Sequence, residues 1–447
     1  MPATISKSEF KRRRSALMSL MAADSIAVIP AASVRTRNRD TEYLFRQDSD
    51  FYYLTGFNEP DAVLVLAPER AHGEVILFCR ERHARSELYD GERLGPERAA
   101  QILDVDDGFP VADLDDILPG MLEGRERIYL SLGDHPEFEN RLLGWVSGIR
   151  ARESGGAIPP GELFALKHLL HEQRLTKSAA EIRVMREAAE ITCHGHRRAM
   201  RAARPGMTES QLEAELVYEF MRRGARTTAY PSIVGGGANG CVLHYVDNAA
   251  TLRKNDLVLI DAGCEFQSYA ADVTRTFPVS GRFGTHQAAL YEIVLAANKA
   301  AIDACVPGAL FMEPHQTALR IMIEGLMDLG LLEGDLEEIL ETEAYRAFCP
   351  HNSSHWLGMD VHDVGDYRVD GASRPLEPGM VLTIEPGIYI PERQETAHLP
   401  ARFRGIGIRV EDDVLITPQG PEVLTAAAPK ELADIETLMA EGLAESP

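Results

Sequence analysis

Hydrophobic and polar positions divide the chain into two stretches with different patterns. Before about residue 155, short apolar runs alternate with segments of helical spacing, which is typical of a compact α/β domain. The turn-forming residues 152–161 favour a linker, and we place the boundary between two domains, 1–172 and 173–447, shortly after it. The apolar runs predict strands at 25–30, 51–54, 62–67, 74–78 and 127–132, and the helical spacing predicts helices near 97–103, 114–122 and 137–146.

The second stretch opens with a strong helix signal. Ser178 and Glu181 have the spacing of a capping box, and Ile182 and Met185 continue at helical spacing. This order of elements suggests a loose two-part repeat with α+β character. One part is a helix near 178–203 followed by strands near 232–234 and 242–245, and the other is a helix near 285–305 followed by strands near 381–384 and 406–410.

Composition and charge exclude some classes of partner. The chain has 69 Asp and Glu against 46 Lys and Arg, a net charge of −23, which repels phosphate backbones and anionic lipids and argues against nucleic-acid or membrane binding. No apolar run approaches the ~20 residues needed to cross a bilayer. Six dispersed cysteines without a Cys-x-x-Cys pair predict buried thiols in a reducing compartment, and hence a cytoplasmic protein.

A glycine-rich segment invites a nucleotide-binding interpretation that its surroundings disfavour. Gly235, Gly237 and Gly240 match G-x-G-x-x-G, but a dinucleotide-binding turn must open a helix. Here the strand-like run 241–246 follows. The segment is therefore predicted to be a tight glycine loop.

Two acidic residues flank a predicted hairpin. Asp261 ends the apolar run 257–260, and Asp272 opens the strand-like segment 273–277. If the hairpin is centred between residues 266 and 267, the two face each other directly, with Cβ atoms ~5 Å apart. Bare carboxylates at that distance repel, and two divalent ions ~3.5–4 Å apart would fit between them. On these residues alone, a turn cap and an ion pair with Arg275 explain the pattern equally well.

Three later residues favour the metal interpretation. Glu385 ends the apolar run 380–384, and His355 offers an imidazole in apolar surroundings. Arg409 and Glu411 share one face of a strand, and Gly407 beside them predicts close approach by another group. Four carboxylates and a neutral imidazole carry a net charge of −4, which two divalent ions would neutralise. Ligation mostly by oxygen with one nitrogen suits Mn²⁺, Co²⁺ or Zn²⁺. The predicted ligands are Asp261, Asp272, His355, Glu385 and Glu411.

At these residues the chain resembles the creatinase/methionine-aminopeptidase ("pita-bread") family, and within it the Xaa-Pro aminopeptidases (aminopeptidase P). The resemblance runs essentially end to end. It implies an N-terminal creatinase-like α/β domain followed by a pita-bread metallopeptidase domain. The motifs that carry it lie, in this order, at 38–40, 50–57, 259–263, 272–278, 354–365, 385–387 and 405–412.

The resemblance implies a dinuclear site, usually manganese-activated, that releases the N-terminal residue from peptides with proline second. A metal-bridged hydroxide would be the nucleophile. His355, Glu385 and Glu411 inherit ligand roles, and Asp261 and Asp272 bridge or chelate the ions. The further roles implied are catalytic for His244, His362 and Glu385, and substrate-binding or supporting for His351, Tyr389, Arg409 and Asp40.

The resemblance also implies assembly and leaves two alternatives open. A homodimer or homotetramer is expected, in which the N-terminal domain reaches a neighbour's active site through Tyr89 and Asp40. One alternative is a prolidase, which cuts only Xaa-Pro dipeptides by the same chemistry. The other is a non-catalytic pita-bread protein that serves as a binding scaffold. The native metal, the preferred first residue and the oligomeric state are not fixed by the sequence.

Overall fold

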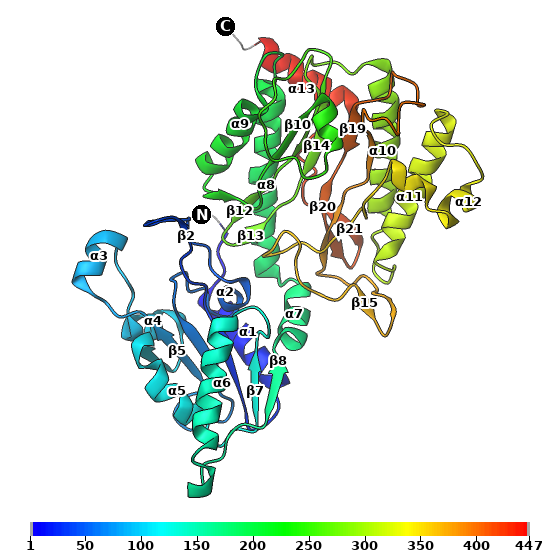
Figure 1. Ribbon diagram of the computed structural model, residues 1–447. Coiled ribbons are helices and arrows are strands. Elements are labelled where there is room, and N and C mark those ends of the chain that lie inside the picture. The colour runs from blue at the N-terminus through cyan, green and yellow to red at the C-terminus, as the bar shows by residue number, and fades with distance from the viewer. Residues whose placement is uncertain (1–2, 445–447) are drawn as a thin grey trace. The chain divides into compact units, whose positions relative to one another are not determined.

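The computed structural model describes residues 3–444 and divides into two compact units (Figure 1). One unit consists of Ile5–Arg174, and the other consists of the chain from Leu175 onward together with residues 3–4. The residues 152–161, predicted to form a linker, lie inside the first unit. The strand that follows them is part of that unit's sheet, so they form a loop within the domain.

The first unit is built on a six-stranded mixed sheet in the order β6-β5-β4-β1-β7-β8. The pairs β1–β7, β7–β8 and β5–β6 are parallel, whereas β1–β4 and β4–β5 are antiparallel. Its strands are β1 (Ser25–Pro30), β4 (Val63–Leu66), β5 (Val75–Cys79), β6 (Asp107–Pro110), β7 (Arg127–Leu130) and β8 (Glu162–Ala165), with a separate hairpin of β2 (Thr36–Asn38) and β3 (Thr41–Glu42).

Both faces of this sheet are buried, which explains why its central strands read as continuous apolar runs. One face packs against α5 and α6, whose leucines and valines form a core with alternate strand residues such as Ile26 and Val65 (Figure 1). The helices of the unit are α1 (Lys7–Leu20), α2 (Ser49–Thr55), α3 (Ala84–Asp90), α4 (Pro96–Leu103), α5 (Leu114–Leu122), α6 (Pro136–Arg150) and α7 (Lys167–Leu175).

The prediction of a strand at 51–54 was wrong, because this segment lies within helix α2. Asp48 caps the helix by accepting a hydrogen bond from the Phe51 amide at 2.9 Å, and Gly56 ends it in the left-handed conformation at φ 65°. The helix is short and buried on nearly every side. Its apolar residues therefore show no helical period in the sequence. Only the capping residues Asp48 and Gly56 indicate a helix here.

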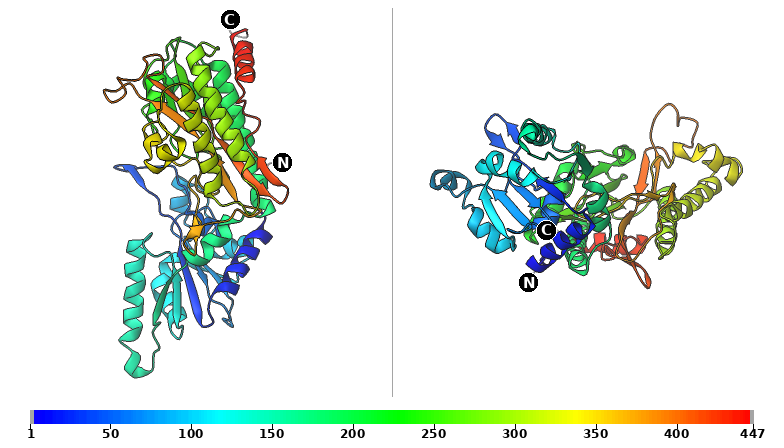
Figure 2. Two further views of the ribbon diagram at one scale, coloured as in Figure 1. Left: turned by 90° about the vertical axis from the view of Figure 1, so that its right-hand side faces the viewer. Right: turned by 90° about the horizontal axis from the view of Figure 1, so that it is seen from below.

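The second unit consists of helices and antiparallel sheets, and the strands predicted near 381–384 and 406–410 as one part of a repeat belong to different sheets. Helices α8 and α9 accompany the sheet β10-β11-β14, and α10 and α11, which pack side by side, accompany the sheet β17-β20-β21 (Figure 2). The helices are α8 (Ala179–Ala202), α9 (Glu209–Arg222), α10 (Thr285–Asp303), α11 (Met312–Asp328), α12 (Leu336–Glu341) and α13 (Leu432–Ala444). The main strands are β10 (Ile233–Gly236), β11 (Leu257–Asp261), β14 (Thr274–Pro278), β17 (Val381–Ile384), β18 (Gly387–Ile390), β19 (Ile406–Arg409), β20 (Asp412–Thr417) and β21 (Gly420–Val423).

Shorter elements complete this unit. The small strands are β9 (Thr227–Thr228), β12 (Cys264–Phe266), β13 (Tyr269–Ala270), β15 (Arg368–Val369) and β16 (Ala372–Ser373). The 3₁₀ turns of the chain are η1 (Val111–Asp113), η2 (Glu153–Gly155), η3 (Gly237–Cys241) and η4 (Ala344–Ala347). The capping box at Ser178 and Glu181 begins α8 as predicted.

Hydrogen bonds join the two halves of the second unit where their strands end. The Glu411 amide donates to the Thr274 carbonyl at 3.0 Å, and the Thr276 hydroxyl donates to the Arg409 carbonyl at 3.0 Å. These bonds hold β14 beside the segment between β19 and β20. The ends of strands that are distant in sequence therefore meet.

The predicted register of the acidic hairpin was wrong by one residue at the turn. Asp261 pairs with Thr274, not with Asp272, because the hairpin is centred between Gln267 and Ser268. Asp272 is therefore a diagonal neighbour of Asp261, and both remain on the same face. Gly263 is required here, since a Cβ at this position would lie 1.6 Å from the Ala271 carbonyl oxygen.

The strand predicted at 242–245 is also absent; the glycine loop passes through η3 into a chain of bends and turns. No helix follows the glycines as a dinucleotide site would need. All six cysteines are free and buried, as predicted. Within residues 3–444, no helix combines the length and apolar composition that crossing a membrane would require.

Candidate metal centre

The five residues predicted as ligands lie together in the second unit. Ligand atoms of Asp272, His355 and Glu411 all fall within 4.8 Å of one another. His355 Nε2 also lies 3.6 Å from a carboxylate oxygen of Glu385. The Tyr230 hydroxyl donates to Asp261 Oδ1 at 2.6 Å and contacts Asp272, which connects the fifth residue to the group.

Strand ends, or positions within two residues of them, deliver the four carboxylates, and backbone hydrogen bonds fix them. Asp261 is the last residue of β11, and Glu385 directly follows β17 with its amide bonded to the Ser353 carbonyl at 2.9 Å. The Asp272 amide donates to both carboxyl oxygens of Asp413 at 3.2 Å. The site therefore rests on the sheets rather than on free loops, which favours precise placement.

The centre holds more negative charge than its own cations balance. Burial, then the charges of Asp272 and Glu385, raise the pKa of Glu411 well above its ordinary value. Burial likewise raises the pKa of Glu385 to about 7 and raises the pKa of Asp261. Such shifts mark buried carboxylates whose negative charge the neighbouring cations do not fully balance. Four carboxyl groups and one imidazole at this spacing are a donor set that suits hard divalent cations, so the residues present fit a metal centre.

His355 is oriented as a metal ligand would be. Its Nδ1–H donates to the Trp356 carbonyl at 3.0 Å, which turns Nε2 toward Asp272 at 3.4 Å. Burial lowers the pKa of this imidazole, but the hydrogen bond to Asp272 and the charge of Glu385 outweigh it and raise the pKa to about 9. A backbone carbonyl on one ring nitrogen is the usual way in which proteins fix the tautomer of a ligating histidine.

Arg409, Tyr389 and His351 form a hydrogen-bonded chain beside the carboxylates. Arg409 donates to Asp261 Oδ2 at 2.6 Å and to the Tyr389 hydroxyl at 2.7 Å. Because that hydroxyl accepts from Arg409, its own proton is directed to His351 Nε2, 2.8 Å away. The other nitrogen of His351 donates to the Asn352 carbonyl at 2.8 Å. Burial, followed by the charge of Arg409, lowers the pKa of His351 to about 4, so the ring is neutral.

The remaining predicted residues have different surroundings. His362 packs edge-on against His355, with ring centroids 4.4 Å apart, and its neighbour Asp363 forms a buried ion pair with Lys177 at 2.9 Å. His244 lies exposed in the segment after η3. Asp40 is exposed at the tip of the β2–β3 hairpin in the first unit.

Sequence reasoning missed two residues at the centre. Tyr230 contacts both aspartates, and the Thr274 hydroxyl donates to Glu411 Oε2 at 2.7 Å while accepting from Arg409 Nε at 3.0 Å. Tyr230 stands outside any strand pattern, so nothing in its local sequence indicates it. Thr274 faces inward two positions after Asp272, on the same side of the chain, but nothing in the sequence indicates its role.

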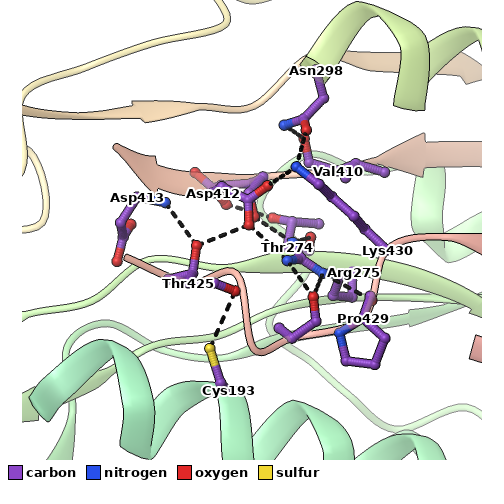
Figure 3. A network of polar contacts seen from close by, with 12 residues as sticks. Cys193, Thr274, Arg275, Asn298, Val410, Asp412, Asp413, Thr425, Pro429 and Lys430 are labelled. Atoms are coloured by element: carbon purple, nitrogen blue, oxygen red, sulfur yellow. Dashed lines mark hydrogen bonds and ion pairs between the residues drawn. The ribbon is translucent and has the colours of Figure 1, made fainter. Parts of the chain in front are cut away.

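A buried polar network lies behind the carboxylates (Figure 3). Arg275 Nη2 and Lys430 Nζ each donate to Asp412 at 2.7 Å, and Thr425 donates to Asp412 at 2.8 Å. Burial opposes ionisation of Asp412, but the two cations outweigh it and lower its pKa to about 2. Arg275 also donates to the carbonyls of Thr274 and Glu411.

Asn298, in the same network, connects it to two predicted ligands (Figure 3). Its side-chain amide donates to the Ile384 carbonyl at 3.0 Å and to the Val410 carbonyl at 3.2 Å. These carbonyls immediately precede Glu385 and Glu411. Lys430 donates to the Asn298 oxygen at 2.7 Å, so the orientation of this amide is determined. One side chain on α10 therefore fixes the spacing between two strand ends.

Comparison with known proteins identifies both parts of the chain. The profile of metallopeptidase family M24 matches residues 183–418, and that of the aminopeptidase P N-terminal domain matches residues 10–129. The chain is 45% identical to the Xaa-Pro aminopeptidase of Escherichia coli (strain K12) over 97% of its own length and 98% of the relative's. It is 44% identical to the Xaa-Pro aminopeptidase of Haemophilus influenzae over 98% of each.

Solved structures agree with the sequence comparison. The structure of Pseudomonas aeruginosa aminopeptidase PepP superimposes with a TM-score of 0.97 at 55% identity, covering 99% of this chain and 100% of that one. Aminopeptidase P from E. coli with the inhibitor Pro-Leu gives 0.95 at 44% identity, with 99% and 100% covered. The chain therefore belongs to metallopeptidase family M24, with an aminopeptidase P N-terminal domain preceding a pita-bread domain.

Proposed function

We propose that this protein is a metal-dependent aminopeptidase that releases the N-terminal residue from peptides with proline in the second position. One observation carries the proposal. A buried group of carboxylates around His355 carries more negative charge than Arg409 and the imidazole balance, and it occurs in a chain 45% identical to an Xaa-Pro aminopeptidase over nearly the whole length of both.

Asp261, Asp272, His355, Glu385 and Glu411 would hold two divalent cations. We propose manganese as the native metal, with cobalt or zinc as alternatives, because the donors are mostly oxygen and include no thiolate. When bound, such ions supply Lewis acidity toward a carbonyl and lower the pKa of a water. The six buried free thiols support a cytoplasmic location, which fractionation of cells would test.

The surrounding residues would act on the substrate. His362, packed against His355, is well situated to donate a hydrogen bond to the developing oxyanion. Glu385 lies between His355 and His351, where its carboxylate can take up a proton and pass it on. We assign to His244 the positioning or protonation of the departing proline nitrogen. An Xaa-Pro bond has no N–H, so selection must act on the ring rather than on a donor.

The chain formed by Arg409, Tyr389 and His351 would orient the site. Arg409 donates a hydrogen bond to Oδ2 of Asp261, and the Tyr230 hydroxyl donates one to Oδ1. Neutral His351 accepts a hydrogen bond from the Tyr389 hydroxyl, and its Nδ1 lies 3.7 Å from Glu385 Oε2. We propose that these residues support the reaction without taking part in bond making.

The first prediction concerns the substrate. Mn²⁺-loaded protein should cleave an Xaa-Pro-Yaa tripeptide and leave the matched Xaa-Ala-Yaa tripeptide intact. The kcat/KM for the tripeptide should exceed that for the Xaa-Pro dipeptide by at least about tenfold, as measured by chromatography of the released residue. A preference for the dipeptide would instead identify a prolidase. A metal-loaded protein that cleaves none of the three would be the binding scaffold.

The second prediction concerns the ligands. Asp272→Ala and Glu411→Gln should each lose bound metal after dialysis and lower kcat/KM by about 10³-fold, since metal assistance is worth several kcal/mol. Metal analysis and peptide assays measure both. Glu422→Gln, which removes a carboxylate from an exposed ion pair with Arg186, is the matched control and should retain metal and activity.

Unfolding of the metal-free proteins separates lost ligation from lost folding. Burial and neighbouring charges favour the protonated, neutral form of Glu411 when no cation is present. Gln resembles that neutral form, so metal-free Glu411→Gln should unfold at the same urea concentration as the metal-free parent. Full metal content in either ligand variant would exclude that residue from the ligand set.

The third prediction separates His362 from the ligands. His362→Ala should lower kcat by about 10²-fold or more, because a positioned donor to the transition state is lost while the five carboxylate and imidazole ligands remain. Its metal content, measured on the same preparation, should equal that of the parent. Loss of metal would move His362 into the ligand set.

The fourth prediction concerns assembly. We propose a homodimer or homotetramer in which Asp40 and Tyr89 of the first unit contribute to a neighbour's site. Helix α3 buries none of its residues, and Leu88 and Tyr89 are 80% and 78% exposed. Light scattering should give two or four times the chain mass of 49.3 kDa. The variant Leu88→Ser/Tyr89→Ser should shift this mass downward, and a monomeric parent would contradict the proposal.

A further inference from the structure

The segment that carries His244 has an ordered inner side although it forms no strand. Leu243 and Tyr245 pack against a buried cluster that includes Ile233, Leu259 and Tyr389, while His244 between them is exposed. Alternate residues thus point inward and outward, and the imidazole is on the outer side. Without strand partners, another group must hold this segment in place.

Glu209 supplies most of that support. It is the first residue of α9, its side chain is fully buried, and its four hydrogen-bond donors are two backbone amides, a side-chain amide and a hydroxyl. An ionised carboxylate offers about four acceptor positions, and here all of them are used. A buried carboxylate held by four neutral donors and no cation is costly unless every bond forms.

The two oxygens of Glu209 hold the chain on both sides of His244. Oε1 accepts from the Gly236 amide at 2.8 Å and from Asn239 at 2.9 Å, on the glycine loop before the histidine. Oε2 accepts from the Tyr245 hydroxyl at 2.9 Å and from the Ala250 amide at 2.8 Å, after the histidine. One side chain therefore fixes the entrance and the exit of the segment.

Close backbone contact relates the segment to the candidate metal centre. A Cβ on Gly407 would lie 2.1 Å from the Gly240 carbonyl oxygen, so the glycine loop rests directly on β19. This contact is the close approach that the sequence predicted for Gly407. Because β19 ends at Arg409, which bonds Asp261, the loop and the carboxylates share one support.

We infer that Glu209 is a positioning residue for His244, acting through the segment 236–250. Its carboxylate bonds the segment on both sides of the histidine, and it would set the distance between the imidazole and the reacting bond. The inference rests on the proposed role of His244 in peptide cleavage. Small displacements of such a group are expensive, since a shift of about 1 Å can cost 10²-fold in rate.

The test is Glu209→Gln with a matched control on the same helix. Glutamine has one acceptor oxygen and one NH₂ group, so it can satisfy only one pair of donors and opposes the other pair. The variant should lower kcat for an Xaa-Pro-Yaa tripeptide by about ten- to a hundredfold, with KM and metal content changed less than about twofold. Glu215→Gln, which breaks an ion pair with Arg198 and no bond to the segment, should behave as the parent.

A double-mutant cycle distinguishes positioning from general loss of structure. If Glu209 acts through the histidine, Glu209→Gln/His244→Ala should have the kcat of His244→Ala alone within about twofold. An effect of Glu209→Gln that persists in full in the His244→Ala background overturns the inference, and so does an unchanged kcat in the single variant.

Hydrogen exchange gives a readout that does not depend on activity. Peptides covering 236–250 should exchange faster in Glu209→Gln than in the parent or in Glu215→Gln, and peptides from β11 and β14 should not. Equal exchange in all three proteins overturns the inference. Failure of the proposed function is distinguishable, because it would appear as an inactive parent while exchange still reports on the segment.

Discussion

The mutual repulsion of buried carboxylates is the constraint on which the rest of the second unit depends. Asp261, Asp272, Glu385 and Glu411 meet around one imidazole, and burial raises the pKa of three of them. A site of this kind is unfavourable until cations enter it, so the surrounding structure must hold the carboxylates at a spacing that they would not choose. The fold meets this requirement by placing the carboxylates at or near strand ends. The backbone hydrogen bonds of the strands prevent any one carboxylate from moving away from the others on its own.

The polar network behind the site fits the same requirement. Arg275 and Lys430 carry two positive charges against the single negative charge of Asp412, so this group has a net charge of +1 next to the carboxylates (Figure 3). Asn298 and Arg275 bind main-chain carbonyls at and beside the ligand positions, not the ligand carboxylates themselves. Asn298 and Arg275 therefore occupy none of the carboxylate oxygens. The network thus adds positive charge beside the site without using a ligand oxygen, because its support comes through the backbone.

Much of this arrangement could be predicted from the sequence, because a strand that ends in an acid is visible in a linear pattern. The helix boundaries at α8 and α10 and the strands around Asp261, Glu385 and Arg409 follow from periodicity and capping. The hairpin register did not follow, because its turn places Gln267 and Ser268 at φ 49° and 64° without the Asn-Gly pair that usually marks such a turn. Tyr230, Thr274 and Asn298 were missed for a different reason, since their importance arises only from contacts between distant segments.

The structure supports two kinds of site residue in two physically different ways. The four predicted carboxylate ligands stand at strand ends or within two residues of them, near a charged network, whereas His244 stands on an irregular segment held by Glu209 through neutral donors alone. A network of charged groups suits carboxylates that repel one another, because several of its bonds share the task of holding them in place. A carboxylate surrounded by neutral donors is more sensitive, because the loss of any partner leaves a buried charge unsatisfied. The segment at His244 is thus expected to be all-or-none in its order, which suits the role that we propose for His244 in positioning or protonating the leaving group.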